Sequence, residues 1–323
     1  MVETVLVHTL KRTLYLSLIL FLPLVTFCTK QDVEIINDTV VDDLVVSLFA
    51  SNSVNHQSAA VFQDYCVMVP DMRSPFYLYN LDQKKLVGGF ELTPGKGKDF
   101  MGNTLFHCNQ STFGVDHYDE NDFFPLLYIS QRAGSDQRCF VEVYRIRPSF
   151  NMGNTDLFSF TVELVQTIFF PPMTSSNSLG NVNCVIDRVN RRMYTYSRNN
   201  NVVDSNYGIC KISRFDIPDP KKETVYLSDS DIKESFMLNC SAVYMQGGCI
   251  ENNFLYIPQG YASAGFIFFN VIDLNKKTLS SQFDLLGAGI QWEPEGCFFY
   301  DGNVMVTAGT NIWRFKIQDN VNS

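Results

Sequence analysis

An all-β fold made of repeated antiparallel sheets is predicted by three observations. One pattern, a strand, a tight turn and a second strand, occurs three times, at residues 183–196, 248–257 and 296–306. A third apolar strand follows each copy, at residues 208–215, 265–272 and 310–317. Aromatic residues make up 14% of the chain, and such side chains are favoured in strands. A single small sheet cannot cover its own apolar faces, so modules of this kind pack against one another.

The remaining strands are placed by apolar alternation and by turn residues. The first module covers residues 59–94, with strands expected at 62–69, 75–81 and 86–92 and a polar turn at 82–85. The second covers residues 104–166, with strands expected at 123–130, 138–146 and 158–168. The third, fourth and fifth modules take residues 180–230, 240–287 and 291–317. One short helix is expected at 229–237, with Ser228 or Asp229 as its cap.

The fifth module shows three strands, and a strand from the other end of the chain would complete it. Residues 33–36 or 44–49 are suitable, because closing a ring in this way protects strand edges. The modules are longer than the about 40–50 residues of typical blades, so a sixth blade between residues 147 and 180 is an alternative. The sequence therefore predicts a β-propeller of five or six antiparallel blades, closed by an N-terminal strand.

The first 28 residues have the outline of an export signal. Lys11 and Arg12 precede an apolar run at residues 14–27, which ends at Cys28 and is followed by polar residues. This position favours lipidation of Cys28, with simple cleavage or a retained anchor as alternatives. The run is shorter than the about 20 residues that a membrane-spanning helix needs. We expect residues 29–323 to form a single domain, exported to the cell envelope as an outer-membrane lipoprotein or a periplasmic protein.

The net charge of −9 and the scattered Lys and Arg residues give no basic surface for nucleic acid. No pattern calls for a cofactor or a metal ion, and a monomer is expected. Six of the nine cysteines fall within apolar strand segments: Cys66, Cys139, Cys184, Cys210, Cys249 and Cys297. Equivalent positions of neighbouring modules should lie beyond the about 4.4–6.8 Å Cα separation of a disulfide, so buried thiols are predicted.

Five short segments carry a resemblance to a known group of proteins. They are residues 62–65, 77–82, 107–109, 124–130 and 293–296. Together they resemble the secreted or lipid-anchored β-propellers of unknown function from Bacteroidetes, over most of residues 57–317. The resemblance implies the propeller fold and a place in the bacterial envelope, and it implies no reaction.

Trp292, Glu293 and Glu295 are the leading candidates for a ligand site. Pro294 favours extended geometry in the residue before it, so the two carboxylates should lie on one side of the strand, about 6.6 Å apart. That is near the lower end of the about 6.5–9.5 Å found in inverting glycosidases, and an indole ring suits the face of a sugar. Neighbours on one strand approach from the same side, however. A hydrolase would therefore need a carboxylate from another blade, the candidates being Asp64, Asp187 and Glu251.

His107, Asn109 and Asp64 are further candidates for contact with a ligand. The acidic segment at residues 116–122 lacks the glycine and the spacing of a calcium loop, so it is interpreted as a solvated loop. Motifs for serine hydrolases, dinucleotides and phosphates are incomplete at residues 260–265, 287–292 and 95–98. The favoured function is a cell-envelope binding or scaffold propeller that recognises a glycan or a protein. A glycoside hydrolase using Glu293 or Glu295 is the alternative.

Overall fold

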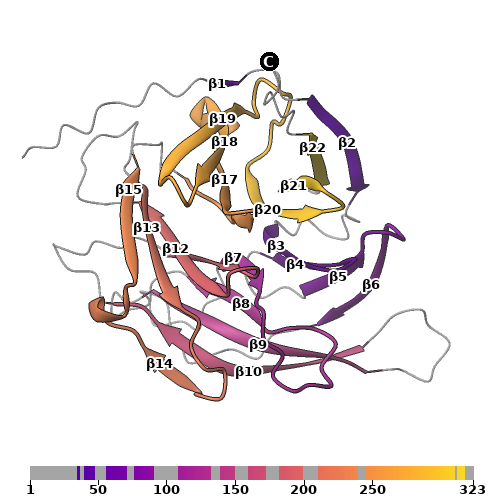
Figure 1. The fold of residues 1–323 in the computed structure, drawn as a ribbon. Helices are drawn as coiled ribbons and strands as arrows, with labels where there is room; N and C mark the ends of the chain where they lie inside the picture. Colours follow the sequence, from indigo (N-terminus) through magenta and orange to yellow (C-terminus); the bar gives the residue numbers. More distant parts are fainter. Residues whose placement is uncertain are drawn as a thin grey trace, which may run out of the picture. The chain divides into compact units, whose positions relative to one another are not determined.

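The computed structural model describes residues 35–36, 40–47, 56–70, 76–90, 108–131, 139–149, 159–171, 182–198, 210–238, 244–309 and 311–316. All of them belong to one compact unit of the chain, residues 33–323. They form five sheets arranged around a common axis (Figure 1). The prediction of an all-β propeller is confirmed, and the blade number is five. Within the described ranges, the helical structure consists of two 3-10 turns, and no helix has the length and apolar character to cross a membrane.

The five blades follow the chain, and most of their strands pair in antiparallel fashion. Blade 1 contains β3 (His56–Phe62), β4 (Tyr65–Pro70), β5 (Phe76–Asn80) and β6 (Lys85–Phe90). Blade 2 contains β7 (Cys108–Phe113), β8 (Leu127–Gln131), β9 (Phe140–Ser149), β10 (Ser159–Phe169) and β14 (Thr224–Tyr226). Blade 3 contains β11 (Asn183–Asp187), β12 (Arg192–Arg198), β13 (Cys210–Asp216) and β15 (Glu234–Leu238). Blade 4 contains β16 (Cys249–Glu251), β17 (Phe254–Tyr261), β18 (Phe266–Asp273), β19 (Thr278–Asp284) and β1 (Ile35–Ile36). Blade 5 contains β20 (Pro294–Tyr300), β21 (Asn303–Ala308), β22 (Asn311–Lys316) and β2 (Val40–Ser47).

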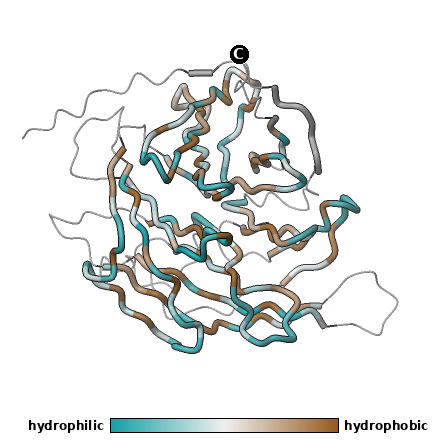
Figure 2. The backbone as a smooth tube through the Cα atoms, viewed as in Figure 1, coloured by the Kyte–Doolittle hydropathy of each residue, from teal (hydrophilic) through white to brown (hydrophobic). Residues whose placement is uncertain are grey.

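The hydrophobic core lies between the blades. Successive side chains of a strand point to opposite faces of the sheet, so each inner strand serves two neighbours. Ala59 packs toward blade 5 and Ala60 toward blade 2. In the same way, Val185 packs toward blade 4 and Ile186 toward blade 2. Because both faces of each sheet are covered, hydrophobic segments (brown) occur in every blade (Figure 2).

The ring is closed by a strand from the N-terminal part of the chain. β2 pairs antiparallel with β22 and completes blade 5, which confirms the prediction of closure and favours the second of the two candidate segments. The other candidate contains β1, which pairs parallel with β19 and adds a fifth strand to blade 4. The alternative of a sixth blade is wrong, because β9 and β10 are the third and fourth strands of blade 2.

Three local predictions are corrected by the structure. The strand expected at 62–69 is a hairpin of β3 and β4, with Gln63 in the left-handed region at φ 53°. The strand expected at 123–130 begins at Leu127. The helix expected at 229–237 is a single 3-10 turn, Asp229–Asp231, followed by β15. The Ser228 backbone N–H and hydroxyl both donate to the Asp231 carboxylate, which satisfies the start of that turn without extending it.

Candidate functional site

The ring of inner strands has two mouths, formed by opposite ends of these strands. β3, β7, β11, β16 and β20 contact one another in a closed ring. A parallel bridge between Gly247 and Gly296 shows that the segments of blades 4 and 5 run in the same direction. The residues that precede or begin the inner strands form what we call the strand-start mouth. The hairpins that follow these strands form the hairpin mouth, where the Tyr300 hydroxyl of blade 5 donates to Asp64 of blade 1 at 3.1 Å.

A hydrogen-bond network joins the inner segments behind the strand-start mouth. Gln110 on β7 donates from Nε2 to the carbonyl oxygens of Ser111 and Gly248, each at 2.8 Å. Tyr196 on β12 donates from its hydroxyl to the carbonyl oxygen of Gln246 at 2.6 Å. These bonds connect blades 2, 3 and 4 across the axis. Buried polar groups that are satisfied in this way fix the register of the elements that carry them.

Glycines allow the inner segments to approach this closely. A Cβ at Gly247 would lie 2.8 Å from Oε1 of Gln110, and one at Gly248 would lie 2.6 Å from the carbonyl oxygen of Tyr256. Neither gap accommodates a side chain without a shift of its neighbours. Burial raises the pKa of Tyr196 well above its ordinary value, so its hydroxyl stays protonated and remains a donor at physiological pH.

The structure places Trp292 and Glu293 together at the strand-start mouth of blade 5. Trp292 is 50% exposed, and its ring stacks on that of Trp313 with centroids 6.3 Å apart. The Glu293 carboxylate accepts a hydrogen bond of 2.6 Å from Nε2 of Gln246. Glu295, in contrast, is buried at 9% exposure on β20. Of the two predicted carboxylates, Glu293 is therefore the one available at the surface.

Two tyrosines extend this surface, and the sequence analysis missed both. Tyr244 is 48% exposed, and its ring meets that of Tyr261 edge to face at a centroid distance of 4.6 Å. A hydrogen bond between the two hydroxyls raises the pKa of Tyr261, and the nearby charge of Glu293 adds to the shift. The signal was present in the repeat: aligning Gly248 with Gly296 places Tyr244 opposite Trp292. We call the group of Tyr244, Gln246, Tyr261, Trp292 and Glu293 the aromatic patch.

The other predicted ligand residues are dispersed. Asn109 is half-buried on β7, while His107 lies outside the described residues. Asp64 is at the hairpin mouth, on the opposite side from the aromatic patch. Asp187 is buried and accepts hydrogen bonds from the backbone N–H and the side-chain amide of Asn190, which commits it to its own hairpin turn.

Part of the acidic segment is neutralised by arginines from neighbouring elements. Asp122 pairs with Arg145 of β9 at 2.8 Å, and Asp116 pairs with Arg191 of the blade 3 hairpin at 2.6 Å. These contacts explain why the segment folds over blades 2 and 3, and they use two of the carboxylates that a cation site would need.

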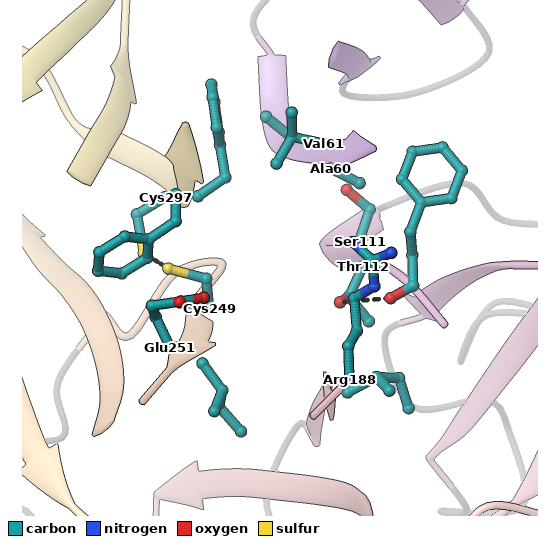
Figure 3. Close-up of a pocket in the computed structure, with 15 residues that line it drawn as sticks. Ala60, Val61, Ser111, Thr112, Arg188, Cys249, Glu251 and Cys297 are labelled. Carbon is teal, nitrogen blue, oxygen red and sulfur yellow. Dashed lines mark hydrogen bonds between the residues drawn. The ribbon is translucent and has the colours of Figure 1, made fainter. Parts of the chain in front are cut away.

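A cavity of about 100 Å³ lies in the ring of inner strands at the hairpin mouth (Figure 3). The inner strands of all five blades contribute to its wall, which exposes both polar and apolar atoms. Its charged lining residues are Arg188, which follows β11, and Glu251, the last residue of β16. Figure 3 shows Glu251 on the wall formed by Cys249 and Cys297, with Arg188 across the cavity. Among the described residues that line it, Glu251 is the single carboxylate, so the cavity lacks the pair that glycoside hydrolysis requires.

Two of the repeated cysteines face each other in this wall. The Sγ atoms of Cys249 and Cys297 are 3.3 Å apart, and both residues are free thiols. The expectation that equivalent residues of neighbouring modules lie far apart is wrong for this pair. The reason is geometric, because inner strands converge on the axis and equivalent positions there come into contact. Burial raises the pKa of Cys249 well above its ordinary value, which keeps this thiol protonated.

The chain has distant structural similarity to several solved proteins. It matches no protein-family model, and no curated protein matches it. It is similar to glutaminyl cyclase from Myxococcus xanthus at 11% identity and a TM-score of 0.44, covering 81% of this chain and 90% of that one. It is similar to virginiamycin B lyase from Staphylococcus aureus, in a catalytically inactive form with quinupristin, at 11% identity and a TM-score of 0.40, covering 83% and 97%. It is similar to BamB from Moraxella catarrhalis at 6% identity and a TM-score of 0.31, covering 82% and 70%. Similarities of this size carry no argument about activity or partner.

Proposed function

We propose that this chain is a binding propeller of the cell envelope that recognises a glycan at the aromatic patch. The observation that carries the proposal is the exposure of Trp292 and Tyr244 at equivalent positions of neighbouring blades, at 50% and 48%. Large aromatic side chains are usually buried, so two of them on one mouth form a surface suited to recognition. Their flat faces match the apolar faces of sugar rings.

Polar groups of the patch supply the directional part of recognition. Glu293 and Gln246 are joined by a hydrogen bond of 2.6 Å, which fixes both side chains beside the rings. A carboxylate accepts hydrogen bonds and an amide both donates and accepts them, as sugar hydroxyl groups require. The proposed envelope location is supported by the export-signal pattern of the first 28 residues and by the predicted lipidation of Cys28; surface glycans occur in that compartment.

A protein partner is the second candidate, and the same exposed aromatic residues favour it. Trp and Tyr dominate the residues that carry most of the binding energy in protein interfaces. The two candidates differ in what the patch must do. A glycan needs the carboxylate of Glu293 for its hydroxyl groups, whereas a protein interface depends mainly on burial of the Trp292 and Tyr244 rings.

The test is a glycan array with residues 29–323, followed by calorimetry on any glycan that binds. We expect Trp292→Ala and Tyr244→Ala each to weaken binding at least about tenfold, as the loss of a central aromatic contact does. The matched control is Tyr226→Ala, because Tyr226 is 65% exposed on the outer strand of blade 2.

Two results would count against the proposal. If no glycan on a broad panel binds, and a captured protein partner loses affinity in Trp292→Ala, the second candidate replaces the first. If Trp292→Ala and the control Tyr226→Ala bind any identified ligand equally well, the aromatic patch is not the site.

A further inference from the structure

The cavity at the hairpin mouth contains two opposite charges, Arg188 and Glu251, that have no hydrogen-bond or ion-pair partner among the described residues. Arg188 forms no hydrogen bond or ion pair with any described group, and its guanidinium lies over the ring of Phe62 at 5.1 Å. Glu251, within the same described part of the chain, accepts no hydrogen bond and forms no ion pair. The two side chains therefore attract each other electrostatically, but they do not form an ion pair. Desolvation lowers the pKa of Arg188, while the charge of Glu251 raises it.

The surrounding polar groups are paired, which sets these two apart. On the same hairpin as Arg188, Arg191 pairs with Asp116, and Asn190 donates to Asn253 at 3.0 Å. A charged group at a partly desolvated mouth costs free energy unless it is compensated. The contact with Phe62 holds the plane of the Arg188 guanidinium but supplies no acceptor for its N–H donors.

We propose that this cavity binds a small zwitterion, an α-amino acid with a short side chain, whose carboxylate pairs with Arg188 and whose ammonium group pairs with Glu251. The charges decide the ligand class. A simple anion would be attracted by Arg188 but repelled by Glu251. A simple cation would be attracted by Glu251 but repelled by Arg188. A ligand that carries both charges is favoured by both residues, which lie across the cavity from each other (Figure 3).

The size and lining of the cavity set the rest of the specificity. One water needs about 10–15 Å³ of such cavity volume, so a cavity of about 100 Å³ holds several waters and accepts a ligand of a few heavy atoms, such as glycine or alanine. Ala60 and Val61 contribute apolar wall for a methyl group. A planar guanidinium binds a carboxylate through two parallel hydrogen bonds, which a lysine at this position would not reproduce.

The experiment is calorimetry on the purified protein with L-alanine and two analogues that each lack one charge. N-acetylalanine has no ammonium group, and alaninamide has no carboxylate. We expect L-alanine to bind and each analogue to bind at least about tenfold more weakly, because each leaves one partly desolvated charge without its partner.

Variants assign each charge to its residue. The Arg188→Gln variant lacks the partner of the carboxylate, so it should bind L-alanine no better than it binds alaninamide. The Glu251→Gln variant lacks the partner of the ammonium group, so it should bind L-alanine no better than it binds N-acetylalanine. Arg191→Gln is the matched control, because Arg191 lies on the same hairpin outside the cavity lining, and it should retain full affinity. Absence of binding by the folded wild type at millimolar L-alanine would overturn the proposal. Equal binding of L-alanine, N-acetylalanine and alaninamide would also overturn it. Because these three measurements use the wild-type protein, they test the proposal even if a variant fails to fold. The site lies at the opposite mouth from the aromatic patch, so its failure leaves the glycan proposal intact.

Discussion

Acidification should destabilise this propeller through one histidine, His56. His56 begins β3, is 6% exposed, and has its Nδ1 atom buried without a hydrogen-bond partner among the described residues. Burial lowers its pKa from 6.5 to about 4, since a desolvated imidazolium is unfavourable. The perturbation we consider is a drop from pH 7 to pH 4.5, with His56→Gln as the variant that removes the titrating group.

The sign and size of the effect follow from proton linkage. The pKa of His56 is lower in the folded state than in the unfolded chain, so the unfolded chain binds more protons between pH 6.5 and about 4. Stability is therefore present above pH 6.5 and is lost as the pH falls toward 4. With these values, wild type should lose about 2 to 3 kcal/mol of unfolding free energy from this group between pH 7 and pH 4.5.

Urea unfolding at the two pH values measures the effect. Carboxylates also contribute to the pH dependence, but their share is common to wild type and variant and cancels in the difference. The drop in unfolding free energy should be smaller in His56→Gln than in wild type by about 2 to 3 kcal/mol. If wild type and His56→Gln show parallel pH dependence, the burial argument for His56 is refuted.

Three further predictions concern the ring of inner strands. Gln110→Ala removes the donor to the Gly248 carbonyl oxygen and should lower stability by about 1–3 kcal/mol in urea unfolding; unchanged stability would mean that water replaces the amide. Gly248→Ala places a Cβ 2.6 Å from the carbonyl oxygen of Tyr256, a backbone atom, and should destabilise by about 1–3 kcal/mol or more, seen as a lower melting temperature. Treatment with a small-molecule disulfide at alkaline pH, which offsets the raised pKa of Cys249, should oxidise Cys249 and Cys297 to a disulfide between blades 4 and 5, because their Sγ atoms are already 3.3 Å apart. Two electrons and two protons pass to the reagent, which leaves as two thiols; the protein loses two hydrogens in mass, and Cys297→Ser should show no such loss.

The blades were predictable because their strands repeat, and the inner strand of blade 1 shows where that signal ends. Residues 56–62 read HQSAAVF, with small and polar side chains where an apolar run would be expected. Inner strands face their neighbours around a narrow axis, so small residues fit and polar ones find partners there. The Ser58 hydroxyl, for example, donates to that of Ser111 on β7 at 2.8 Å. Such cross-blade partners are far apart in sequence, which hides the strand.

The candidate site was predictable in part for the same reason. Trp292 and Glu293 stand out in the sequence because they directly precede a proline at the start of a predicted strand. Tyr244 became visible only through its equivalent position in the preceding repeat. The encounter of Cys249 with Cys297 depends on how closely the blades converge, and the spacing of the repeat does not encode that distance.

The pairing of β2 with β22 makes the two ends of the domain depend on each other. Blade 5 receives three strands from late in the chain and one from its beginning. The ring of blades therefore cannot close until β22 has been synthesised. An N-terminal truncation that removes part of β2 and a C-terminal truncation that removes part of β22 would therefore damage the same sheet. New termini cut into a loop between two blades, with the old ends joined, would instead keep β22 and β2 connected through the former ends.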